Sequence, residues 1–140
     1  MSASANEALV FQAIEAIWNR GDLDAADALF APAYLNHYGL ITDLVAGPEA
    51  IKISAALYRL AFPGLHVSVE EIRTVDDIVV VRWTASATLG RSSTTTTTPE
   101  VVAGITRSRI AAGKIIESWT EWDRVGVLRK LGITPTSEPE

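Results

Sequence analysis

The side chain with the clearest capacity for proton chemistry in this sequence is Asp123, near the C-terminus. Trp119 and Glu121 share its parity, so an extended strand would place all three side chains on one face. If that face borders an apolar cavity, lost solvation would raise the pKa of Asp123 from about 3.9 and make it a usable proton acceptor or donor. From spacing alone, the commoner interpretation is a structural aspartate that caps Gly126 or pairs with Arg124.

Glu121 would give the same face a second carboxyl group. Two carboxylates in one pocket would hold a single proton between them and titrate in separate steps, as a general acid–base pair does. The alternative is that strand twist or a bulge turns Glu121 towards solvent.

Arg82 interrupts an otherwise apolar run over residues 78–88. It either pairs with an acid such as Glu117 or Asp123, or binds an anionic or carbonyl group of a ligand. Trp83 and Trp119 would stack on a flat ligand if they face a cavity, although large aromatic residues on strands also serve as core residues.

The sequence has two histidines. His37 lies between Asn36 and Tyr38, where the chain leaves the second predicted helix. It is a candidate second proton-transfer group at a pocket rim, or else a surface or packing residue. His66 would point to the opposite face of its strand from Leu65 and Val67, and it is expected to face solvent. Two isolated histidines and no repeated carboxylate spacing predict no metal site.

The composition is that of one globular domain of 140 residues, with 48% hydrophobic and 21% charged residues. A net charge of -5 and the lack of a basic run argue against nucleic acid as a partner. There is no cysteine, which excludes disulfides and thiol chemistry and fits a cytoplasmic protein. No signal peptide, membrane span, phosphate-binding glycine loop or serine-hydrolase elbow is recognisable.

Periodicity divides the chain into a helical half and a strand half. Apolar residues at helical spacing predict helices over about residues 6–20, 23–30 and 48–62, with a brief extended piece over 34–38. After Pro63-Gly64 the period becomes two, and strands are predicted over about residues 65–75, 78–88, 101–110 and 114–123. A phase shift at Glu70-Glu71 predicts a β-bulge in the first of these strands.

Expectations for three further segments complete the assignment of the chain. Residues 89–100 include five consecutive threonines and are either a mobile hairpin tip or a lid over a pocket. A terminal turn of helix is expected over residues 126–131, and residues 133–140 are a tail after a single domain over 1–132.

Helices followed by an antiparallel meander predict an α+β domain with its helices on one face of a sheet. The predicted bulge would curve the sheet strongly. A curved sheet leaves a cone-shaped cavity beneath it, and such cavities bind small molecules.

Several of these segments match one family in order and spacing. Trp18 to Asp24, Phe62-Pro63-Gly64-Leu65 and residues 77–84, then 113–119 with Asp123 and finally 128–132, resemble the SnoaL-like polyketide cyclases of the NTF2-like superfamily. The resemblance implies a homodimer with a cone-like α+β barrel and no metal or organic cofactor. It also implies that Asp123 moves protons during an intramolecular aldol ring closure.

Two positions depart from the family pattern. The cyclases often carry a histidine where this chain has Ala87-Thr88-Leu89, and many carry another where Thr106 stands. Histidine-assisted cyclisation is therefore unsupported.

The leading hypothesis is a cofactor-independent enzyme that acts on a hydrophobic carbonyl-containing or polycyclic metabolite. Asp123 and His37 would be catalytic, and the expected ligand contacts are Asn36, Tyr38, Arg82, Trp83, Thr106, Trp119 and Glu121. One alternative is epoxide hydrolysis, in which Asp123 activates water together with Glu121 and Arg82. The other is a small-molecule-binding protein without catalysis.

Overall fold

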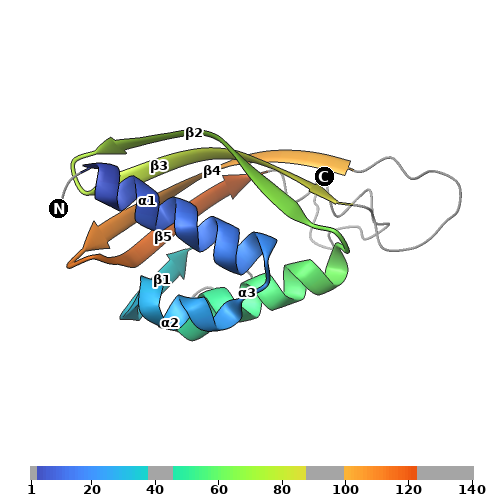
Figure 1. The fold of residues 1–140 in the computed structure, drawn as a ribbon, viewed down its shortest axis with the longest axis horizontal. Helices are drawn as coiled ribbons and strands as arrows, with labels where there is room; N and C mark the ends of the chain where they lie inside the picture. The colour runs from blue at the N-terminus through green and yellow to red at the C-terminus, as the bar shows by residue number, and fades with distance from the viewer. Residues whose placement is uncertain (1–2, 38–45, 88–99, 123–140) are drawn as a thin grey trace, which may run out of the picture.

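A computed structural model describes residues 3–37, 46–87 and 100–122 of the chain (Figure 1). Asp123 and Tyr38 lie outside the described residues. So do almost all of the predicted 89–100 loop, and the whole of the predicted 126–131 helical turn and 133–140 tail. Within the described ranges, no helix is both long enough and apolar enough to cross a membrane.

The predicted helices are confirmed with modest changes in their bounds. The first is an α-helix, α1 (Ala3–Ala13), that continues as a π-helical turn, η1 (Ile14–Asn19). The second is a 3-10 turn, η2 (Leu23–Ala25), followed by α2 (Ala26–Leu29). The third is α3 (Pro48–Ala61), which begins with a proline that has no backbone N–H to leave unpaired.

Five strands form one mixed sheet in the order β1-β5-β4-β3-β2. They are β1 (Phe30–His37), β2 (His66–Val75), β3 (Ile78–Ala87), β4 (Glu100–Ala111) and β5 (Lys114–Trp122). β1 runs parallel to β5, and every other neighbouring pair is antiparallel. The predicted bulge in β2 is confirmed by a register shift between Val69 and Glu71.

β1 is longer than the brief extended piece predicted over residues 34–38, and it contains Pro32. Because β1 is an edge strand that pairs only with β5, a proline without an N–H is tolerated there. The β1–β5 register is irregular between Phe30 and Leu35, where Pro32 lies.

A second bulge, in β5, was not predicted. Arg109 pairs with Glu117, whereas Ile110 pairs with Ile115, so Ile116 is an extra residue in β5. Consequently Ile115 faces the helices together with three later residues of the opposite parity, Ser118, Thr120 and Trp122. Ile115 and Trp119 have the same parity in the sequence but lie on opposite faces of the sheet, so the expectation of strict alternation along this strand is wrong within β5.

The helices cover one face of the curved sheet, which stays open between its edge strands β1 and β2 (Figure 1). The core lies between these two layers. Its fully buried side chains include Ile17 from η1, Ala55 from α3, Val79 and Val81 from β3, and Ile115 from β5. Burial of each large aliphatic side chain stabilises the fold by roughly 1.5–3 kcal/mol. The α+β architecture expected from the sequence is confirmed.

Candidate functional site

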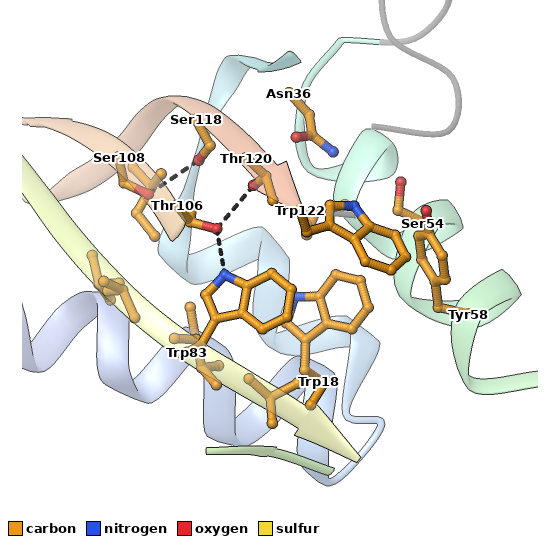
Figure 2. Close-up of a pocket in the computed structure, with 18 of the residues that line it drawn as sticks. Trp18, Asn36, Ser54, Tyr58, Trp83, Thr106, Ser108, Ser118, Thr120 and Trp122 are labelled. Carbon is orange, nitrogen blue, oxygen red and sulfur yellow. Dashed lines mark hydrogen bonds between the residues drawn. The ribbon is translucent and has the colours of Figure 1, made fainter. Parts of the chain in front are cut away.

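The space between the helices and the sheet holds a pocket of about 200 Å³ (Figure 2). Its walls come from α1 and η1, from β1, from α3 and from the inner faces of β2 to β5. A dry cavity of about 150 Å³ is known to hold benzene, so this pocket has room for a larger ring system. Among the described residues that line it, none is Asp, Glu, Lys, Arg or His.

Three indoles and a phenol form an aromatic arc along the pocket. Trp83 and Trp122 have ring centroids 6.4 Å apart, and Tyr58 meets Trp122 edge-on at 5.9 Å. The ring centroids of Trp18 and Tyr58 are 6.0 Å apart. Aromatic faces arranged in this way favour flat, apolar ligands.

The position of Trp18 is fixed by the π-helical turn η1 and its neighbours. The Arg59 guanidinium, from α3, donates to the carbonyl oxygens of Trp18 at 2.7 Å and Asn19 at 3.2 Å. The Asn19 side chain in turn accepts from the N–H of Val67 at 2.7 Å and donates to its carbonyl oxygen at 2.9 Å. The end of η1 is thus tied to α3 and to the start of β2. Such π-helical turns often occur at functional sites.

Hydroxyl groups from β4 and β5 form a ladder on the sheet wall of the pocket (Figure 2). Trp83 Nε1–H donates to Thr106 Oγ1 at 3.0 Å, and Thr106 Oγ1 lies 2.9 Å from Thr120 Oγ1. Ser108 Oγ and Ser118 Oγ are 3.2 Å apart. Each hydroxyl pair joins residues directly opposite each other in the β4–β5 register. These polar groups therefore satisfy one another without a ligand.

Tyr34 is a pocket-lining side chain whose pKa is clearly shifted. It is 1% exposed, and burial raises its pKa above the usual value of about 10, although a hydrogen bond with Ser118 opposes the shift. Tyr34 is therefore a neutral phenol at physiological pH. It contributes polarity to the pocket floor and no charge.

Ser54 is a pocket residue that the sequence analysis did not identify. It lies on α3, is 2% exposed, and its Oγ has no hydrogen-bond partner among the described residues. The signal was present in the sequence. Ser54 lies at helical spacing between Ile51 and Tyr58, so it is a polar residue on the face that α3 turns towards the core.

Three of the predicted ligand contacts line the pocket: Asn36, Trp83 and Thr106. Asp123 and Tyr38 lie outside the described residues, so their predicted roles are untested.

The other predicted site residues lie on the outer face of the sheet, and their predicted places at the pocket need correction. His37 Nε2 is 2.7 Å from Glu117 Oε2, and the His37 ring stacks on Trp119 with centroids 5.3 Å apart. Alternation along β1 explains this placement: Tyr34 and Asn36 line the pocket, so His37 points the other way. In β5, the bulge turns Trp119 and Glu121 outwards.

Arg82 is on the outer face as well. Its guanidinium donates to Glu71 Oε1 from Nη2 at 3.1 Å and from Nε at 3.2 Å. The ion-pair interpretation of Arg82 is thus confirmed with a different partner, since Glu117 binds His37 and Arg109 instead. Because Arg82 and Glu121 both lie outside the pocket, the arrangement predicted for epoxide hydrolysis is not supported. His66 is exposed, as expected.

The residues that the structure describes contain no group of three His, Asp or Glu side chains placed to hold a metal ion.

Comparison with known proteins gives a family and a fold. The family model described as SnoaL-like polyketide cyclase matches residues 8–131. No curated protein is a significant match to the sequence.

Three solved structures illustrate the structural similarity. A candidate polyketide cyclase from Acidithiobacillus ferrooxidans is 22% identical, with a TM-score of 0.79, and the alignment covers 94% of this chain and 98% of that one. IdmH, a candidate polyketide cyclase from Streptomyces antibioticus, is 26% identical, with a TM-score of 0.76 and coverage of 91% and 99%. A protein from Catenulispora acidiphila with a ketosteroid isomerase-like fold, crystallised with trimethylamine, is 21% identical, with a TM-score of 0.72 and coverage of 94% and 97%. The NTF2-like fold expected from the sequence is confirmed.

Proposed function

This chain belongs to the SnoaL-like polyketide cyclase family, and we propose that it is a cofactor-independent enzyme that moves a proton next to a carbonyl group of a small hydrophobic metabolite. The metabolite would be neutral and would contain at least one flat ring system. Cyclisation and isomerisation both begin with this proton transfer.

The observation that carries the proposal is the chemistry of the pocket lining. Its described walls combine the indoles of Trp18, Trp83 and Trp122 with aliphatic residues and hydroxyl groups, and they contain no charged side chain. An anionic or cationic ligand would lose its hydration there without gaining a counter-charge. Neutral, largely apolar molecules are the ligands that fit such walls.

Asp123 is the proposed base. The family resemblance supports this assignment. β5 ends at Trp122, which lines the pocket, so strand alternation does not place the side chain of Asp123. A carboxylate bordering walls of this kind would be poorly solvated, which raises its pKa and makes it a better proton acceptor. In the proposed step, the C–H bond next to the carbonyl breaks, the proton passes to Asp123, and the electron pair remains as an enolate. The enolate then attacks an electrophilic carbon or recovers a proton.

Hydrogen–deuterium exchange tests this step without knowledge of the natural substrate. 1-Tetralone, a neutral bicyclic ketone, has acidic protons at C2, and their replacement by deuterium in D2O is visible by proton NMR. We expect the protein to accelerate this exchange, and we expect Asp123→Asn to reduce the acceleration at least about 100-fold.

Asp24→Asn is the matched control, because Asp24 is exposed in η2 and does not line the pocket. It should exchange protons at the wild-type rate. Full activity of Asp123→Asn would overturn the proposed role of Asp123, and a wild-type rate equal to that of buffer would overturn proton transfer altogether.

A non-catalytic carrier of small molecules is a second candidate. It is favoured by the lack of charged side chains among the described lining residues. For a carrier, 1-tetralone would bind in the pocket while its C2 protons exchanged no faster than in buffer.

A further inference from the structure

Serine and threonine hydroxyl groups on two walls of the pocket differ in their hydrogen bonds. On the sheet wall, Thr106 bonds with Trp83 and Thr120, and Ser108 bonds with Ser118. On the helical wall, Ser54 Oγ is buried and has no partner among the described residues. Figure 2 shows Ser54 on α3, on the far side of Trp122 from the hydroxyl ladder.

An unpartnered buried hydroxyl group costs stability, because folding removes its hydrogen bonds with water and supplies none in exchange. A helical serine can usually avoid this cost by donating to the carbonyl oxygen four residues earlier. Ser54 does not do so, and its side chain lines the pocket instead. Asn6 Oδ1 is the other buried polar atom without a partner among the described residues, but Asn6 is not a pocket residue.

We propose that Ser54 is the hydrogen-bond anchor of the pocket and donates its O–H to a carbonyl oxygen of a neutral ring ligand. The inference rests on the proposed function in taking a carbonyl compound as the ligand. It adds the position of the carbonyl: the oxygen faces α3, and the rings lie among Trp18, Trp83 and Trp122. The hydroxyl ladder then acts as a satisfied wall against which the ligand packs.

Two matched probes separate the anchor from general hydrophobic binding. 1-Tetralone carries a carbonyl group, and tetralin is the same bicyclic skeleton without it. Binding is followed through the indole N–H signals in a proton–nitrogen NMR spectrum. Trp18, Trp83 and Trp122 line the pocket and should shift, whereas Trp119 is on the outer face and serves as an internal negative control.

Ser54→Ala should weaken the binding of 1-tetralone about 5- to 10-fold, the loss typical of one neutral hydrogen bond. It should change the dissociation constant of tetralin less than twofold. In the ligand-free protein, Ser54→Ala should leave the melting temperature unchanged or raise it, because it removes a hydroxyl group that has no partner.

Ser108→Ala is the matched control on the opposite wall. Ser108 is also a buried pocket serine, but its hydroxyl is bonded to Ser118. This variant should lower the melting temperature and should keep the wild-type ratio of 1-tetralone affinity to tetralin affinity.

An equal loss of affinity for both probes in Ser54→Ala, or no loss for 1-tetralone, would overturn the anchor while leaving the proposed enzyme intact. In another outcome, Ser54→Ala would weaken the binding of 1-tetralone but not of tetralin, while the wild-type protein would not accelerate exchange of the C2 protons. That pattern would sustain the anchor and overturn the proposed proton transfer. Failure of both probes to bind would overturn both.

Discussion

Single hydroxyl groups determine both the stability and the polarity of the pocket. Tyr34 is buried at its floor and hydrogen-bonds with Ser118, which also bonds with Ser108. A chain of three hydroxyl groups therefore crosses from β1 through β5 to β4. Loss of the Tyr34 hydroxyl removes one of these two bonds, while Ser118 keeps its bond with Ser108.

Tyr34→Phe should lower the free energy of unfolding at pH 8 by about 1 kcal/mol. Above about pH 10 the difference from wild type should shrink. Burial raises the folded pKa of Tyr34, so its contribution is fully present below the pKa of the unfolded state and is lost as pH rises beyond it. The wild type alone then loses up to about 1.4 kcal/mol per pH unit from this residue. Urea unfolding at pH 8, 10 and 11 measures the effect, and parallel pH curves for the two proteins would contradict it.

Residue types alone predicted part of the site. Trp83 and Asn36 were expected at the pocket and line it. Trp119 and Glu121 were expected there because they share one parity with Asp123 and also with the apolar Ile115 at the start of the strand. Because Ile116 is an additional residue in β5, the residues after it lie on the face opposite to the one predicted by counting from Ile115. Neither the residue type of Ile116 nor its neighbours in the sequence indicate a bulge.

At the scale of elements, β4 must leave room for an indole from β3. Gly104 lies directly opposite Trp83 in the β3–β4 register. A Cβ atom on Gly104 would overlap the six-membered ring of Trp83. The absence of a side chain at this position therefore lets the Trp83 ring lie against β4 and reach Thr106.

Gly104→Ala should destabilise the protein by about 1–3 kcal/mol, as overpacking of a well-packed site does. It should also shift the Trp83 indole N–H signal, since the hydrogen bond to Thr106 would be distorted. In a Trp83→Phe background the smaller ring relieves the overlap, so the added alanine should cost less. Urea unfolding of the four proteins measures this coupling, and equal costs in both backgrounds would contradict the account.

Element types and order were predictable because their signals are local. The proline at the start of α3 and the change of period after Pro63-Gly64 are read directly from the sequence. The length of β1 could not be predicted, because a proline such as Pro32 is tolerated only when its strand lies at the sheet edge, and the sequence does not show which strand does. Sheet order is a tertiary property that no local pattern contains.

At the scale of the whole molecule, the outer face of the sheet exposes apolar and charged side chains together. Leu35 is 42% exposed on β1, and Val101 is 62% exposed on β4. These exposed side chains are available to pack against a second copy of the chain. The homodimer implied by the family resemblance is therefore our expectation for the assembly.

Sedimentation equilibrium should give a mass of twice 15.1 kDa. Val101→Lys should shift the equilibrium towards a 15.1 kDa species, because it places a charge on the exposed apolar surface. A wild-type mass of 15.1 kDa throughout the micromolar range would contradict the expectation.

The central claim is that Asp123 supplies the carboxyl group that transfers protons in a pocket whose described walls carry no charged side chain. A carbon-13 NMR titration of the side-chain carboxyl groups, with the Asp123 signal assigned from Asp123→Asn, measures its pKa directly. The account predicts a pKa well above the usual value of about 3.9, and a further rise when 1-tetralone displaces water from the pocket. A pKa at or below 3.9, unaffected by 1-tetralone, would contradict it.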